Sequence, residues 1–293
     1  MLQASSGRRG LLPVALCVAT MLAAACALAG TGTDPDQSTF VPGTSLVGQG
    51  NVQVELGVAQ AKDGDGTSYM RAWTTPMLLR IGTPSTYEFR VQTNAYKRLR
   101  TYSAVESGMG DLTLGFKAAV PQNMNQNMSI AFVGQAAVPS GSETLNNHGF
   151  RPEVQLIGKL QMPNSNSLGA IAGLKYDMDQ NDTRYKSATL AGNASHTWNA
   201  KWASYVEGGI EPWTNASRGG KNLMVNVGSS WCPMPASQLN ATVGFGLKDN
   251  DTNLAWTVGY SRRFSPSAIK TYGHKQDKDD SSKTPSASSE DGK

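Results

Sequence analysis

The stretch "GMGDLTLGFKAAVP" (Gly108–Pro121) alternates apolar and polar residues. Every second position is apolar: Leu112, Leu114, Phe116, Ala118 and Val120. The positions between them carry an acid, a hydroxyl, a glycine and a base: Asp111, Thr113, Gly115 and Lys117. Successive side chains of a β-strand point to opposite faces, so the pattern predicts a strand with one apolar and one polar face. Such a strand fits a soluble sheet between core and water, or a membrane barrel between lipid and a wet lumen.

The same period of two recurs up to Phe264, and no convincing helical period interrupts it. Clear examples are "NVQVELGVA" (51–59), "YEFRVQTNA" (87–95), "QLNATVGFGLK" (238–248) and "LAWTVGYSRRF" (254–264). About twelve such segments fit into the chain, an even number as in single-chain bacterial outer-membrane barrels. Short connections alternate with longer or more charged ones, which is the usual asymmetry between periplasmic turns and external loops of those barrels.

Composition narrows the class of protein. The 293 residues include 31 glycines, and only 16% are charged, which suits β architectures with many tight turns. From Gly30 onward there is no apolar run of about 18 residues, so no transmembrane helix is expected there. The net charge is +4, and no basic stripe with interleaved aromatic residues indicates a nucleic-acid partner.

The N-terminus predicts export. Arg8 and Arg9 precede the apolar run Leu11–Ala29, which ends in Ala-Leu-Ala. This is typical of a secretory signal peptide cleaved near Ala29/Gly30. A retained anchor, or a lipoprotein modified at Cys26, is the alternative. Cleavage would leave Cys232 as the single cysteine, so the mature chain has no internal disulfide.

Four regions follow from these patterns. Residues 1–29 form the signal peptide, and residues 30–45 are a flexible Gly/Pro/Thr-rich lead-in. Residues 46–264 form the barrel. Residues 265–293 are a hydrophilic tail with too few apolar side chains to offset the entropy of ordering, which predicts disorder.

The charges on the polar faces favour a membrane barrel. These faces carry six bases and five acids: Arg80, Arg90, Lys117, Lys159, Lys175 and Arg263, with Glu55, Glu88, Asp111, Glu153 and Glu207. Nearly balanced charge suits a narrow lumen, because an uncompensated charge in a low-dielectric interior is costly. Aromatic residues near the strand ends fit interfacial girdles. We therefore predict an all-β protein, a transmembrane antiparallel up-and-down β-barrel of the bacterial outer membrane, over a soluble β-sandwich or lipocalin-like barrel.

Several short motifs resemble one family. They are the Gly-x-Gly-Asp-Leu stretch at Gly108–Leu112, the following Lys117, Pro139-Ser140-Gly141, and a closing segment that ends at Phe264. In this order and spacing the chain is similar to the outer-membrane proteins named for a meta-pathway of phenol degradation, also described as transporters. The resemblance implies transport of aromatic or other hydrophobic solutes. It also implies that Tyr260 and Phe264 belong to a terminal assembly signal, although family members usually end there and this chain continues with a tail.

The residues indicate no enzyme, no metal site and no cofactor. Ser195 and His196 are adjacent in a strand, so they point to opposite faces and cannot pair. The candidate selectivity residues are instead charges that face the lumen: Arg80, Glu88, Arg90, Asp111, Lys117, Glu153 and Lys159.

Two functions stay open. The chain is a passive channel or transporter for small solutes, or a non-conducting outer-membrane barrel that binds partners through its loops or tail. Expected partners are small solutes, the barrel assembly machinery, and outer-membrane lipid and lipopolysaccharide, whose phosphates Lys97, Arg98 and Arg100 in an external loop could bind.

Overall fold

The computed structural model describes residues 33–37, 39–64, 69–121, 127–145, 148–178, 182–214, 220–247 and 254–265. One compact unit comprises Thr31–Phe264. The predicted signal peptide (1–29) lies outside the described residues, as does the predicted tail apart from Ser265.

Thirteen β-strands make up a single sheet. They are β1 (Val52–Asp63), β2 (Met70–Gly82), β3 (Tyr87–Thr101), β4 (Val105–Gly108), β5 (Leu112–Val120), β6 (Met128–Val138), β7 (Arg151–Met162), β8 (Asn166–Met178), β9 (Arg184–Thr197), β10 (Trp202–Thr214), β11 (Gly220–Trp231), β12 (Ser237–Gly246) and β13 (Leu254–Phe264).

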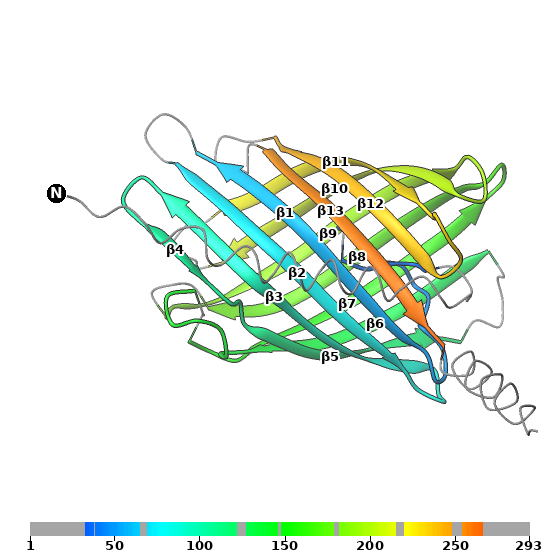
Figure 1. Cartoon of the computed structure of the whole chain (residues 1–293), viewed down its shortest axis with the longest axis horizontal. Coiled ribbons are helices and arrows are strands. Elements are labelled where there is room, and N and C mark those ends of the chain that lie inside the picture. Colours follow the sequence, from blue (N-terminus) through cyan, green and yellow to red (C-terminus); the bar gives the residue numbers. More distant parts are fainter. Residues whose placement is uncertain are drawn as a thin grey trace, which may run out of the picture. The chain divides into compact units, whose positions relative to one another are not determined.

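The sheet closes on itself. Apart from β4 and β5, strands that follow one another in the chain pair antiparallel, and β13 returns to pair with β1 from Val52↔Phe264 to Lys62↔Leu254 (Figure 1). β4 and β5 pair with successive parts of β3, so together they occupy one position around the barrel. The result is a closed barrel of twelve positions, as the sequence pattern predicted. Among the described residues, no helix has the length and apolar character to cross a membrane.

The barrel is polar inside and apolar outside. In β5, Phe116 is 42% exposed while Lys117 is 0% exposed. The same division holds around the barrel, where the outward faces expose leucine, valine and phenylalanine and the inward faces bury charged and amide side chains. This confirms the prediction of lipid on one side and a polar lumen on the other, because a soluble β-barrel would bury the apolar face.

The two ends of the barrel differ. At one end β2–β3, β7–β8 and β9–β10 are joined by residues 83–86, 163–165 and 198–201, and β1 begins and β13 ends there. We call this the short-turn end. At the opposite, long-connection end, β6 and β7 are joined by residues 139–150. Aromatic pairs lie near both ends: Trp202 stacks on Trp231 at 5.8 Å near the first, and Trp73 meets Trp256 edge-on at 5.4 Å toward the second.

Residues 33–37 and 39–47 lie inside the barrel, and we call them the luminal segment. The sequence predicted a flexible lead-in over 30–45, which did not anticipate this docking. Val41 and Val47 are 5% and 1% exposed, and Asp36 and Thr44 are also buried. The segment has no regular secondary structure, so its burial depends on contacts with the barrel interior rather than on a sheet of its own.

Candidate functional site in the barrel lumen

Three glutamates on the barrel interior hold the backbone of the luminal segment. Glu55 on β1 accepts hydrogen bonds from the backbone N–H groups of Asp36 (2.9 Å) and Gln37 (3.1 Å). Glu207 on β10 accepts one from Phe40 N (2.9 Å), and Glu88 on β3 accepts one from Val47 N (2.8 Å). An irregular segment has no ladder partners for its N–H groups, so these carboxylates satisfy donors that would otherwise be buried unpaired.

An apolar contact fixes the middle of the segment. Val41 packs with the inward-facing Val133, Ile157 and Ile171, and Phe40 packs against the same cluster. Gly209 on β10 borders the same contact. A Cβ at this position would lie 3.1 Å from the Ala191 Cβ, which is tight, and 3.4 Å from Cδ2 of the Phe40 ring. These inward apolar residues interrupt an otherwise polar lumen, and the luminal segment covers them.

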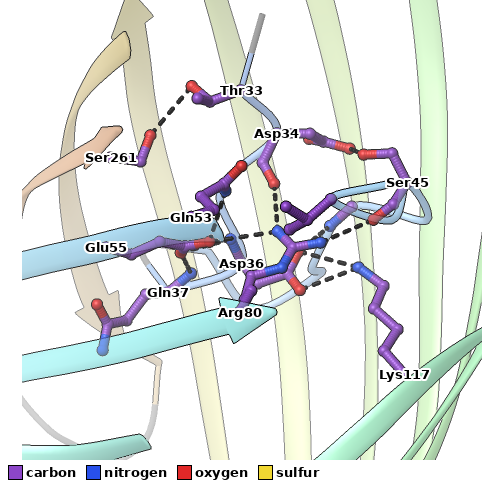
Figure 2. Close-up of polar contacts among 12 residues, drawn as sticks. Thr33, Asp34, Asp36, Gln37, Ser45, Gln53, Glu55, Arg80, Lys117 and Ser261 are labelled. Atoms are coloured by element: carbon purple, nitrogen blue, oxygen red, sulfur yellow. Dashed lines mark hydrogen bonds and ion pairs between the residues drawn. The ribbon is translucent and has the colours of Figure 1, made fainter. Parts of the chain in front are cut away.

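Asp36 of the luminal segment completes a buried ionic cluster. Its carboxylate accepts hydrogen bonds from Lys117 Nζ (2.9 Å) and Arg90 Nη1, and lies 3.6 Å from Arg80 Nη1. Figure 2 shows the side chains of Asp36, Arg80 and Lys117 together, and none of the three has exposed surface. Three cations from β2, β3 and β5 therefore meet one carboxylate that the barrel strands themselves do not supply.

The guanidinium of Arg80 donates hydrogen bonds both to barrel side chains and to the backbone of the luminal segment. It donates to Glu88 Oε1 (2.6 Å) and Glu55 Oε1 (3.2 Å), which are barrel residues. It also donates to the backbone carbonyls of Asp34 (2.8 Å) and Ser45 (2.8 Å), which belong to the segment (Figure 2). Arginine suits this position because its planar fork can satisfy several acceptors at once while remaining charged.

The charges of the cluster balance. Arg80, Arg90 and Lys117 are offset by Glu55, Glu88 and Asp36. Burial opposes ionisation of Asp36, but the neighbouring charges of Arg80, Lys117 and Arg90 outweigh it and hold the pKa of Asp36 below its ordinary value. Asp36 is therefore an anion throughout the physiological pH range.

The lumen contains two polar cavities. Toward the long-connection end a cavity of about 260 Å³ is lined by Asp111, Arg151, Glu153 and Lys97, with amide side chains between them. Toward the short-turn end a cavity of about 230 Å³ is lined by Lys159 and mainly by serine, threonine and amide side chains. Both cavities are polar, and residues of the luminal segment, among them Asp34, Thr39 and Val41, line the one toward the short-turn end.

The structure divides the charges that the sequence singled out into three groups. Arg80, Glu88, Arg90 and Lys117 come together in the ionic cluster. Asp111 and Glu153 lie in the cavity toward the long-connection end, where Asp111 pairs with Arg151 at 2.6 Å and Glu153 accepts from Gln135 Nε2 at 2.8 Å. Of the seven candidate selectivity residues, Lys159 alone lines the cavity toward the short-turn end. Tyr260 and Phe264 are half-buried on β13, where Phe264 pairs with Val52 in the closing seam.

Sequence reasoning missed Asp36. It lies in a segment without periodicity, so no strand pattern assigned it to the lumen. One signal was present: the inward faces carried six bases against five acids, one negative charge short of balance. Among the described residues, no group of three or more histidine, cysteine, aspartate or glutamate side chains could hold a metal ion.

The closed antiparallel barrel with an apolar exterior and a charged lumen defines the chain as an outer-membrane type β-barrel. It belongs to the family described as "Putative MetA-pathway of phenol degradation", whose model matches residues 35–264. No curated protein sequence matches the chain.

Three solved structures share the fold at low sequence identity. The COG4313 outer membrane channel from Pseudomonas putida F1 is 13% identical with a TM-score of 0.61, covering 79% of this chain and 100% of that one. The NanC porin is 10% identical with a TM-score of 0.50, covering 72% and 98%. The translocator domain of the autotransporter NalP from Neisseria meningitidis is 13% identical with a TM-score of 0.50, covering 86% and 97%.

Proposed function

We propose that this protein is a passive channel for small solutes in the bacterial outer membrane, and that the luminal segment forms its narrowest point. The observation that carries the proposal is the pair of polar cavities, of about 260 and 230 Å³, in a lumen that also holds the luminal segment and its ionic cluster. Cavities lined by charges and amides suit diffusing polar solutes, and rings of charge set selectivity in channels of this kind. Similarity in fold to a channel and a porin supports the same reading.

The solute class follows from the family rather than from the lumen. Because the family is named for phenol degradation, small aromatic compounds with a polar group are the first solutes to test. Amide and charged side chains of the cavity toward the long-connection end, such as Gln135 and Glu153, offer hydrogen bonds to such a polar group.

Single-channel recording in planar bilayers tests the proposal. The mature chain is refolded, its heat-modifiable migration confirms a folded barrel, and conductance is measured with the native sequence and with Glu153→Lys. We expect a small conductance, because the luminal segment narrows the lumen, and a shift toward anion selectivity in the variant. If the native chain conducts and Glu153→Lys leaves its ion selectivity unchanged, the lumen charges do not set the selectivity.

A non-conducting barrel that binds partners is the second candidate, and the buried luminal segment favours it. The segment fills the lumen with ion pairs and apolar contacts that a permanently open pore would not need. If neither the native chain nor a variant that releases the segment conducts, the channel proposal fails and this alternative replaces it.

A further inference from the structure

Four cations gather on the outward face of the barrel at the long-connection end. Lys62 on β1 pairs with Arg71 on β2, and Arg71 pairs with Arg100 on β3. Arg98 is two residues from Arg100 on the same face of β3 and pairs with Trp73. We call these four residues the cationic row. The sequence placed Arg98 and Arg100 in an external loop, but β3 continues to Thr101 and holds both in the sheet.

Register places the cationic row outside the barrel rather than in the lumen. Directly paired residues share a face, and Arg98 pairs with Trp73, which is 37% exposed among the outward aromatic residues. Lys62 likewise pairs with Leu254, which is 39% exposed. Lys62, Arg98 and Arg100 are themselves exposed.

The row lacks acidic partners within the described part of the chain. No salt bridge there involves any of its four members. Asp63, the neighbour of Lys62, is buried, and Glu106 pairs with Leu99, so it points to the face opposite to Arg98 and Arg100. Like charges at directly opposed positions destabilise a sheet, so three in register across β1, β2 and β3 favour the binding of an anion beside them.

Arg71 has a hydrogen-bond donor for which the structure provides no acceptor. Its guanidinium lies over the Tyr69 ring, 5.8 Å from the centroid, which fixes the direction of the side chain. Its Nε is buried and has no hydrogen-bond partner in the structure. The strongest partner for an oriented guanidinium is an oxyanion that accepts two parallel N–H bonds, such as a phosphate or a carboxylate.

The position of the row selects the ligand. Along β1 the outward positions run from the exposed Val58, through Gln60, to Lys62, and Gln60 accepts a hydrogen bond from the indole of Trp256. Trp256 and Trp73 form the aromatic pair of this end. Aromatic residues of membrane barrels lie at the interface, so the next outward position along the strand reaches the lipid headgroups.

We propose that the cationic row binds the phosphate groups of the glycolipid that forms the outer leaflet of the outer membrane. The site rests on the outer-membrane location proposed above, with the long-connection end facing outward. Arg71 and Arg100 clamp one phosphate between adjacent strands, while Lys62 and Arg98 neutralise its remaining charge. The barrel is thereby held at a fixed depth, with Trp73 and Trp256 against the acyl boundary.

The test compares the native refolded chain with a variant in which all four cations become glutamine (K62Q/R71Q/R98Q/R100Q). Binding is measured from the rise in thermal unfolding temperature when purified lipopolysaccharide is added to the detergent-solubilised barrel. Lys201→Gln, an exposed cation in the turn at the short-turn end, serves as control. We expect the quadruple variant to bind about tenfold more weakly or worse, because each charge-assisted hydrogen bond to phosphate is lost, while the control binds normally.

Two further arms separate the source of the ligand. Lipopolysaccharide stripped of its phosphates should stabilise the native chain no more than it stabilises the quadruple variant. Inorganic phosphate at the same concentration should give no shift, because it lacks the acyl chains that bring the headgroup to the row. Equal shifts for the native chain and the quadruple variant would overturn the proposal, and so would an equal shift with inorganic phosphate.

Conductance of the same variants keeps this proposal distinct from the channel function. None of the four cations lines either lumen cavity, so the quadruple variant should retain the native conductance. A barrel that stays silent both as the native chain and as a variant that releases the luminal segment, yet still binds phosphorylated lipopolysaccharide, would refute the channel and leave the lipid site intact.

Discussion

Asp36→Asn tests whether the ionic cluster holds the luminal segment in place. The substitution keeps the shape of the side chain and removes its charge, which leaves Arg90 and Lys117 without the carboxylate that lies 2.9 Å from Lys117 Nζ. With the segment docked, these cations stay buried and uncompensated. With the segment released, water enters and solvates them. The variant should therefore shift the equilibrium toward the released state.

The size of the shift can be worked from the cluster. Removing one partner of a buried ion pair costs about 3–5 kcal/mol. The lower end applies here, because Glu88 still lies 3.5 Å from Arg90 and continues to offset part of the charge. A loss of about 3 kcal/mol in docking free energy raises the released-to-docked ratio by about a hundredfold, since about 1.4 kcal/mol corresponds to a factor of ten.

Two assays measure this ratio. Single-channel recording should show longer or more frequent high-conductance openings in Asp36→Asn. In a Cys232→Ser background, the thiol of Val41→Cys should react with a small aqueous thiol reagent about a hundredfold faster when Asp36→Asn is added. Asp34→Asn is the matched control, because Asp34 lies in the same segment and, within the described residues, the hydrogen bond that its carboxylate accepts comes from Ser45 Oγ, at 2.7 Å, in an exposed contact. If both variants match the native chain in opening and labelling rate, the ionic cluster does not hold the segment.

Three further predictions follow from the same geometry. Val41→Asp should release the luminal segment in conductance recordings, because it buries a carboxylate in an apolar contact; native conductance would contradict this. Arg80→Met should lower the temperature at which the barrel loses its heat-modifiable migration, because Glu55 and Glu88 lose their shared cation. Gly82→Ala should also lower that temperature, since a Cβ would overlap the backbone leading into β1, whereas Gly158→Ala has open space and should be neutral; equal effects of the two would refute the steric argument.

Local pattern was enough to predict the barrel. The alternation in β5 and β13 assigned each side chain to one of two faces, because successive side chains of a pleated strand point to opposite faces. The alternating segments at 51–59, 87–95, 238–248 and 254–264 overlap β1, β3, β12 and β13. The same rule identified Arg80, Glu88, Arg90 and Lys117 as inward residues, and the register of β2, β3 and β5 confirms that they share the interior.

Other features depended on the closed structure. Asp36 precedes the first strand and has no periodic neighbours, so only the folded interior could show that three cations converge on it. The cationic row arises from register between strands, which pairs Lys62 with Arg71 and Arg71 with Arg100 across separate stretches of sequence. Sequence alone determined which face each strand residue takes, because that choice is local. Tertiary structure decided which charges meet and what fills the lumen, because those contacts form between residues far apart in the chain.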